Sequence, residues 1–106
     1  MDRAVHAFTM RLKAGAAEEY RRRHDAIWPE LAALLHQTGI SDYSIFHDEQ
    51  TDILFATYKL AADNGVEELA DNPLMRQWWD YMAPLMETDV TNRPLEKPLT
   101  PVFRMD

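Results

Sequence analysis

The first third of the chain changes from a period-two hydrophobic pattern to a helical one. Over residues 4–12, every second side chain from His6 onward is large and mostly apolar, which predicts a strand with one apolar face. From Ala16 onward, apolar residues recur at intervals of three and four, as they do along one stripe of a helix. Pro29 lacks a backbone donor and disfavours helical geometry at Trp28, so we expect a kink or a new helix at this point.

The middle of the chain predicts a hairpin. Residues 42–48 and 53–60 have the composition of strands, and the polar four-residue connection between them has hairpin length. Both faces of the 53–60 segment carry apolar residues, which indicates a strand at the centre of its sheet. Gly39 follows the preceding helical segment and is expected to be its C-cap.

The remaining residues combine a helical segment with an extended arm. The helical pattern resumes at Val66 after a turn signal, is interrupted at 72–73 and continues to about Met86. Residues 87–101 hold prolines and few apolar side chains, so we expect an arm that follows the surface. A short final strand is predicted over residues 102–105.

The resulting order, β-α-β-β-α-β, predicts a ferredoxin-like α+β fold in a single domain that spans residues 1–106. In this fold a four-stranded antiparallel sheet carries its helices on one face and leaves the other face bare. An apolar bare face has to be covered, and packing against the sheet of a second copy is the simplest solution for so short a chain. We therefore expect a homodimer in which the two sheets form a barrel-like α/β assembly.

Composition limits the classes of partner. The chain has 11 Lys+Arg against 18 Asp+Glu, a formal net charge of -7. This argues against a nucleic-acid partner, because affinity for phosphate backbones comes from clustered basic residues. The chain has no cysteine, hence no disulfide framework or thiolate site, and it has neither a signal-peptide pattern nor about 20 consecutive apolar residues. We expect a cytoplasmic protein, without membrane association, that binds small molecules or other proteins.

Tyr20 and His24 lie in the segment with the highest density of chemically versatile side chains. They are four residues apart, so on a helix they project from the same face and can touch one ligand. Imidazole titrates near neutrality and a phenol can orient a hydrogen bond, which makes the two a plausible acid–base pair. Packing of both rings into the core, or exposure of both, is the competing interpretation that the spacing leaves open.

Trp78 and Trp79 form the second candidate. Adjacent residues on a helix diverge by about 100°, so both rings belong to the core only if two apolar environments flank the helix; otherwise one ring faces a cavity. Indoles stack on the C–H faces of sugars and donate an N–H, as pyranose binding requires. Tyr43, which opens the second predicted strand, has the same ambiguity between core and site.

Other motifs are less informative. The arginine run over 21–23 points in three directions and is surrounded by acids, which favours an ion-paired surface over a phosphate site. His6, His36 and His47 lack the spacing of metal ligands, so no metal is expected. With three glycines in the chain and no phosphate-cradling loop, a nucleotide cofactor is not expected either.

The two dense segments, taken in this order, resemble the L-rhamnose mutarotase family. The resemblance covers nearly the whole chain, and its most specific part is the block R-R-H-x-x-I-W-P-E-L. The matching residues are Glu19-Tyr20-Arg21-Arg22-Arg23-His24, Ile27-Trp28-Pro29-Glu30-Leu31, Asp42-Tyr43-Ser44-Ile45, Leu54-Phe55-Ala56-Thr57, Trp78-Trp79, Tyr81-Met82 and Val102-Phe103.

The resemblance implies a dimeric ferredoxin-like fold and an isomerase that interconverts the α and β anomers of a 6-deoxyhexose, L-rhamnose, without a metal or organic cofactor. It implies that His24 is the general acid, and that Tyr20, Tyr43, Trp78 and Trp79 line the sugar site. The chain departs from the family pattern mainly over residues 61–72 and 88–101, which leaves the preferred sugar open.

Two other functions stay open at this point. Dimeric ferredoxin-like folds also include cofactor-independent monooxygenases and haem-degrading enzymes, which use His, Trp and Asn in a comparable cleft. A non-catalytic sugar-binding or interaction module would use the same aromatic residues without turnover. The sequence identifies neither the general base nor any contribution of a partner chain to the site.

Overall fold

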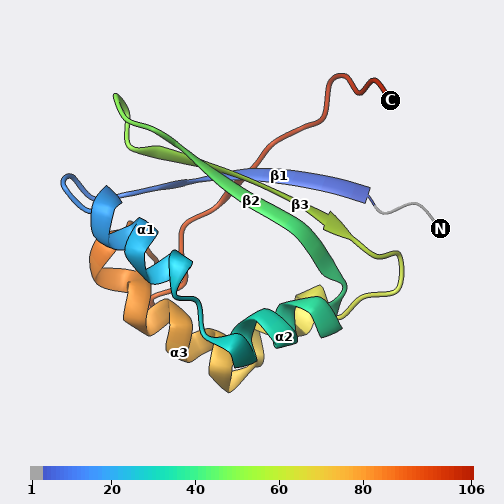
Figure 1. Ribbon diagram of the computed structural model, residues 1–106, viewed down its shortest axis with the longest axis horizontal. Coiled ribbons are helices and arrows are strands. Elements are labelled where there is room, and N and C mark those ends of the chain that lie inside the picture. The colour runs from blue at the N-terminus through green and yellow to red at the C-terminus, as the bar shows by residue number, and fades with distance from the viewer. Residues whose placement is uncertain (1–3) are drawn as a thin grey trace.

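A single antiparallel sheet organises the protein (Figure 1). The computed structural model describes residues 4–106. Strands β1 (Ala4–Arg11), β2 (Ile40–Asp48), β3 (Ile53–Leu60) and β4 (Lys97–Pro98) follow the spatial order β2-β3-β1-β4. All three neighbouring pairs are antiparallel. The predicted hairpin and the central position of the 53–60 strand are confirmed, since β3 pairs with both β1 and β2.

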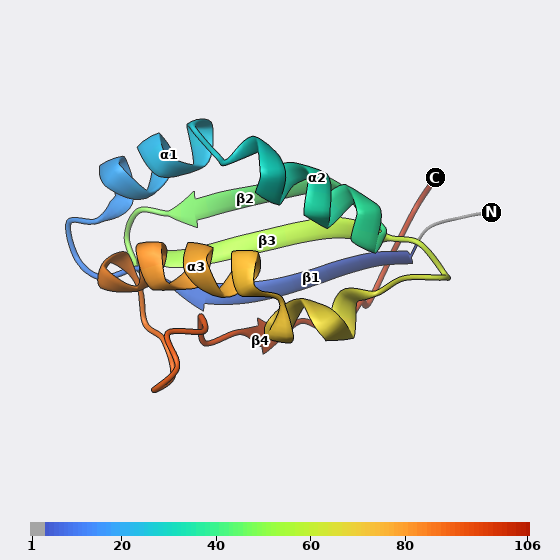
Figure 2. The same cartoon turned by 90° about the horizontal axis from the view of Figure 1, so that it is seen from below.

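The helices lie together on one face of this sheet (Figures 1 and 2). They are α1 (Ala17–Asp25), α2 (Pro29–Thr38) and α3 (Pro73–Met82), with 3-10 turns η1 (Val66–Asp71) and η2 (Ala83–Leu85) before and after α3. The predicted four-stranded antiparallel sheet with its helices on one face is therefore confirmed. Within residues 4–106, no helix combines the length and apolar character needed to cross a bilayer.

Local sequence signals determine where the helices begin and end. Trp28 is extended, with φ -60° and ψ 127°, and Pro29 starts α2 as a new helix, because the residue before a proline avoids α geometry. Gly39 caps α2 in the left-handed region at φ 108°, where a glycine has no Cβ to clash. At the start of α3, the side chain of Asn72 accepts a hydrogen bond from the backbone N–H of Leu74 at 2.9 Å, as an N-cap does.

The hydrophobic core fills the space between the sheet and the helices. The predicted alternation along β1 holds from Phe8 onward, because Phe8 and Met10 are buried while their neighbours are not, whereas His6 of the same predicted face is exposed. Leu31 of α2 is fully buried, and burying a leucine contributes about 1.5–3 kcal/mol to stability. The other members of the core include Phe8, Met10, Leu12, Tyr20, Leu54, Ala56, Met75, Trp78, Met82 and Met86.

The opposite face of the sheet has no helix over it (Figure 1). Phe46 of β2 and Phe55 of β3 lie directly opposite one another in the strand register, and they are 66% and 40% exposed. Val5 of β1 is 51% exposed and alternates with the inward residues of its strand. The sheet thus carries an apolar strip on the face that the helices leave bare.

The predicted final strand over residues 102–105 is wrong. The fourth strand is Lys97–Pro98, inside the segment that we expected to be an arm, and the last residues are exposed without regular structure. The backbone N–H of Leu99 still donates to the oxygen of Ala7 at 2.9 Å. The pairing with β1 stops after Leu99, and Pro101, which cannot donate to a strand ladder, precedes the apolar tail.

Candidate active site

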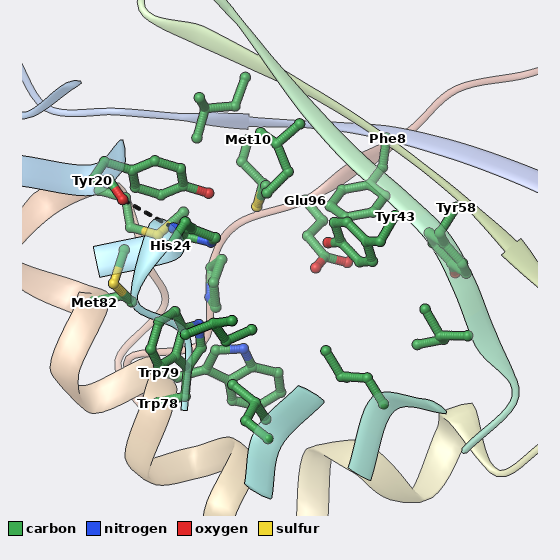
Figure 3. A pocket seen from close by; sticks show the side chains of 18 of the residues that line it. Phe8, Met10, Tyr20, His24, Tyr43, Tyr58, Trp78, Trp79, Met82 and Glu96 are labelled. Carbon is green, nitrogen blue, oxygen red and sulfur yellow. Dashed lines mark hydrogen bonds between the residues drawn. The ribbon is translucent and has the colours of Figure 1, made fainter. Parts of the chain in front are cut away.

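The five residues singled out in the sequence line one cavity between the inner face of the sheet and the helices (Figure 3). Tyr20 and His24 come from α1, Tyr43 from β2, and Trp78 and Trp79 from α3. The cavity has a volume of about 1160 Å³, somewhat above the range of about 300–1,000 Å³ for small-molecule sites. The fold therefore brings together residues that are up to 59 positions apart in the chain.

The contact between His24 and Tyr20 fixes the tautomer of the imidazole. Nδ1 of His24 lies 3.0 Å from the backbone oxygen of Tyr20. Because a carbonyl oxygen only accepts, Nδ1 must carry the hydrogen. The two rings also stack, with centroids 4.2 Å apart. Nε2 is consequently the ring nitrogen left to exchange a proton with a ligand.

The surroundings of His24 disfavour its charged form. Burial lowers the pKa of His24 below its ordinary value, and the hydrogen bond to Tyr20 and the charge of Asp25 oppose this shift in part. Trp78 meets the imidazole edge-on, with ring centroids 5.4 Å apart. An aromatic enclosure of this kind excludes water from the imidazole and raises the cost of its charged form.

A second aromatic wall lines the cavity on the sheet side. Tyr43 stacks on Tyr58 with centroids 5.6 Å apart, and Phe8 meets both rings edge-on. Burial is the main cause that raises the pKa of Tyr20 and Tyr43 well above the ordinary phenol range. These phenols stay protonated near neutral pH and serve as neutral hydrogen-bonding groups.

Trp78 and Trp79 occupy different surroundings, as the divergence of adjacent helical residues requires. Trp78 is buried and packs edge-on against Trp28 at 5.1 Å, whereas Trp79 is half-buried. The guanidinium of Arg93 lies over the ring of Trp79, 5.4 Å from its centroid. Trp28 also stacks on Tyr81, so its ring packs against two aromatic side chains of α3.

The cavity wall is rich in polar atoms that no protein group uses. Among residues 4–106, no hydrogen bond holds the hydroxyl groups of Tyr20, Tyr43 and Tyr58 or the indole N–H groups of Trp78 and Trp79. Nor does the same part of the chain bury any unsatisfied side-chain nitrogen or oxygen away from solvent. A ligand with several hydroxyl groups would find donors on two sides of this cavity.

A salt-bridge cluster at the back of α1 holds the site residues in place. Arg22 and Arg23 both bind Glu19, each at 2.6 Å, and they hold the pKa of its carboxyl at about 2. The guanidinium of Arg23 also lies 4.1 Å from the ring centroid of Tyr81 and donates to the Tyr81 backbone oxygen. The arginine run is thus ion-paired as predicted, and one of its members joins α1 to the segment after Trp78.

The other histidines make no comparable constellation. His6 is exposed and stacks on Tyr58, His36 is exposed on α2, and His47 bonds Asp52 across the hairpin at 3.0 Å. Within the described part of the chain, no three His, Asp or Glu side chains are grouped as metal ligands would be.

The lining residues that the sequence pattern did not single out include Tyr58, Arg93 and Glu96. Tyr58 was treated only as an apolar strand residue, although the period-two pattern of β3 places it on the same face as Ala56. Arg93 and Glu96 lie in the arm, whose position depends on the pairing of β4 with β1. No local pattern in the sequence indicates that pairing.

The whole chain matches one protein family. The model of the L-rhamnose mutarotase family matches residues 5–105. The chain belongs to the L-rhamnose mutarotase family. The L-rhamnose mutarotase of Jannaschia sp. (strain CCS1) is 54% identical over 100 residues, which cover 94% of this chain and 96% of the relative. The L-rhamnose mutarotase of Flavobacterium johnsoniae is 50% identical over an alignment of 107 residues that covers both chains completely.

A solved structure of the L-rhamnose mutarotase family supports the same assignment. The crystal structure of L-rhamnose mutarotase FA22100 from Formosa agariphila superposes with a TM-score of 0.90 at 44% sequence identity. The match covers 97% of this chain and 99% of that one. The structural similarity therefore covers the full β-α-β-β-α-β fold, including the segments that build the cavity.

Proposed function

We propose that this protein is an L-rhamnose mutarotase, an isomerase that interconverts the α and β anomers of L-rhamnose by opening and reclosing the sugar ring. The observation that carries this function is one cavity, in a chain of this family, that joins a half-buried imidazole to aromatic walls with free donors. Membership of the L-rhamnose mutarotase family favours a mutarotase over an oxygenase, a haem-degrading enzyme or a binding module.

His24 is the proposed general acid. Ring opening needs a proton on the ring oxygen and the loss of the proton from the anomeric hydroxyl, which yields an open-chain aldehyde. Nδ1 is engaged with the Tyr20 carbonyl, so the imidazolium form of His24 delivers its Nε2 proton to the ring oxygen, while water or another polar group takes the proton of the anomeric hydroxyl. After rotation about the C1–C2 bond, the ring oxygen closes on the other carbonyl face and returns its proton to Nε2, and the new anomeric oxygen regains a proton from the same base. A positioned acid of this kind contributes about 10²–10⁴-fold to a rate.

Tyr20, Tyr43, Trp78 and Trp79 are the proposed substrate-binding residues. Their rings offer flat apolar surfaces for the C–H faces of a pyranose, and their hydroxyl and N–H groups can hydrogen-bond its hydroxyls. Holding the sugar in one orientation converts a chance proton transfer into a directed one. The chemistry consists of proton transfers alone, so we propose no metal or organic cofactor.

We further propose that the protein works as a homodimer in the cytoplasm, without a membrane or nucleic-acid partner. The apolar strip with Phe46 and Phe55 supports the dimer, because a second copy would cover it. The net charge of -7 supports a soluble protein that does not bind nucleic acids.

Saturation-transfer NMR tests the activity directly. When the H1 resonance of one anomer of L-rhamnose is saturated, the saturation is transferred to the other anomer at the rate of anomer exchange. The enzyme should raise this rate in proportion to its concentration. L-fucose and the common hexoses form the comparison panel and show which sugar is preferred. Binding of the sugar without faster exchange would instead indicate a binding module. A visible haem band, or dioxygen consumption with a phenolic substrate, would indicate one of the other enzymes.

A further inference from the structure

The strand register brings Glu96 into the cavity. In the pairing of β4 with β1, Pro98 lies opposite Phe8 and Lys97 opposite Thr9. Continuing this antiparallel register by one residue places Glu96 opposite Met10, on the face that the helices cover. Side chains alternate between the faces of a strand, so Lys97 points to the bare face and Glu96 points inward. Figure 3 shows the Glu96 side chain beside Tyr43, at the edge of the open space that His24 and Trp79 also border.

Backbone and side-chain contacts hold this part of the arm on both sides. Leu99 donates its backbone N–H to Ala7 at 2.9 Å after β4. Before β4, the side chain of Asn92 donates to Asp80 of α3 at 3.1 Å, and Arg93 lies over the ring of Trp79. The carboxyl group of Glu96 is therefore carried on a segment that is fixed to both walls of the cavity.

The carboxyl group of Glu96 is not occupied by an interaction within the described part of the chain. The other two acids of residues 87–101 are occupied: Glu87 pairs with Arg11 at 3.7 Å, and Asp89 accepts hydrogen bonds from the backbone of Thr91 and its hydroxyl. Among the described residues, no hydrogen bond or ion pair reaches the carboxyl group of Glu96. Glu96 is exposed in the single chain, but desolvation by its neighbours raises the pKa of its carboxyl group, and the charge of Arg93 opposes that shift.

Glu96 adds a carboxylate acceptor to this wall of the cavity. Indole N–H groups only donate, an imidazole held in one tautomer offers a single acceptor nitrogen, and each phenol oxygen carries a proton of its own. Sugar hydroxyl groups are donors as well as acceptors, and a carboxylate can accept from two neighbouring hydroxyls at once. Glu96 and His24 border the cavity from different walls (Figure 3), so one sugar can reach both groups with different parts of its ring.

We propose that Glu96 is a substrate-binding residue whose carboxylate accepts hydrogen bonds from two adjacent sugar hydroxyls remote from the anomeric carbon. This contact fixes the ring so that its anomeric end faces Nε2 of His24, and it selects sugars by the positions of those hydroxyls. The inference rests on the proposed function, because it takes a monosaccharide as the ligand of this cavity.

The test compares Glu96→Ala and Glu96→Gln with the wild type and with Glu87→Gln, which removes a charge from the same arm outside the cavity. Anomer exchange of L-rhamnose is measured by saturation transfer over a range of sugar concentrations. Hydrogen bonds to charged groups are strong, so we expect Glu96→Ala to raise KM roughly tenfold to hundredfold with kcat changed less than about threefold. Glu96→Gln keeps one acceptor oxygen, so its KM should lie between those of the wild type and Glu96→Ala. The KM of Glu87→Gln should match that of the wild type.

Deoxy sugars identify the hydroxyls. The wild type should have a higher KM for 3-deoxy and 4-deoxy analogues of L-rhamnose than for L-rhamnose itself. In Glu96→Ala, the KM for these analogues should be little higher than its KM for L-rhamnose. The proposal would be overturned by an unchanged KM in Glu96→Ala or by a loss confined to kcat. It would also be overturned if the KM increases caused by the mutation and by the missing hydroxyl were fully additive. The wild-type measurement separates the two levels of inference, because wild-type enzyme that fails to accelerate exchange contradicts the proposed function itself. Glu96 holds no protein partner, so equal melting temperatures of all variants should confirm intact folds.

Discussion

The imidazole of His24 and the backbone oxygen of Tyr20, one helical turn earlier, are joined by a hydrogen bond of 3.0 Å. The bond turns a residue that could donate from either nitrogen into one with a defined reactive atom, Nε2. Trp78 closes the other side of the imidazole, so two residues from two helices, Tyr20 of α1 and Trp78 of α3, set its orientation. Catalysis by proton transfer depends on this kind of fixed geometry.

Replacing His24 tests the proposed acid. His24→Ala should remove the acceleration of anomer exchange, a loss of about 10²–10⁴-fold for a general acid, while the sugar still binds through the aromatic walls. His6→Ala is the matched control, since His6 is exposed on β1 and does not line the cavity, so its replacement should leave exchange unchanged. Exchange rates are measured by saturation transfer at equal enzyme concentration. Wild-type rates in His24→Ala would exclude His24 from the chemistry.

The pH profile tests the direction of proton transfer. An acid must be protonated in the free enzyme, and burial lowers the pKa of His24 below its ordinary value near 6.5. We therefore expect kcat/KM to fall with rising pH, by up to about tenfold per unit above that lowered pKa. The profile is measured after subtraction of the buffer-catalysed exchange. A rate that instead rises through this range and then levels off would assign His24 as the base in ring opening.

The same pKa shift affects stability, and it has the opposite dependence on pH. Between the lowered folded pKa and the unfolded value near 6.5, the unfolded histidine binds more protons than the folded one. The free energy of unfolding contributed by His24 therefore falls as the pH drops below about 6.5. Circular dichroism at each pH shows that changes in rate do not come from unfolding.

Local chemistry explains why much of the fold could be predicted from the sequence. The break at Pro29 follows from the geometry of one peptide, and the central place of β3 follows from apolar residues on both of its faces. Tyr20 and His24 were found by their spacing on one helix. Trp78 and Trp79 were ambiguous by spacing alone, because only the position of α3 against the sheet decides what each ring faces.

The missed features depend on pairings between distant segments. Strand β4 is two residues long, and its position is decided by contacts with β1 rather than by its own hydrophobic pattern. The apolar residues at 102–105 have a more strand-like pattern, but the pairing with β1 stops after Leu99, before Pro101 and these residues. Glu96 could not be assigned to the cavity before this register was known.

Arg23 should stabilise the site by joining α1 to the end of α3. Its side chain is 18% exposed, binds Glu19 and covers the ring of Tyr81. We expect Arg23→Ala to lower the free energy of unfolding by about 1–2 kcal/mol, through the lost cation–π contact and hydrogen bonds. Arg23→Lys should recover only part of this, because an ammonium lacks the planar fork of a guanidinium.

The matched control for Arg23 is Arg22→Ala. Arg22 binds the same Glu19, but its side chain is 63% exposed, so its ion pair is screened by solvent and its loss should matter little. Urea unfolding followed by tryptophan fluorescence measures all three variants. Equal losses of stability in Arg22→Ala and Arg23→Ala would show that only the charge near Glu19 matters, and that the contact with Tyr81 contributes nothing.

The apolar strip on the bare face of the sheet should control the oligomeric state. Phe46 and Phe55 lie opposite each other and are 66% and 40% exposed, and a two-fold axis would use each of them twice in one interface. Burial of a phenylalanine contributes about 1.5–3 kcal/mol. Phe46→Lys removes two such contacts and places two charges in the interface, so we expect dimer affinity to fall at least about a hundredfold.

Sedimentation equilibrium at micromolar concentration distinguishes a dimer from the 12.4 kDa chain. Val90→Lys is the control, because Val90 is fully exposed in the arm and its substitution adds the same charge away from the sheet. The wild type and Val90→Lys should sediment as dimers and Phe46→Lys as a monomer. A wild-type monomer over the whole concentration range would contradict the homodimer. In that case the exposed phenylalanines would have to be tolerated as a solvated surface, which their area and their direct pairing across two strands make costly.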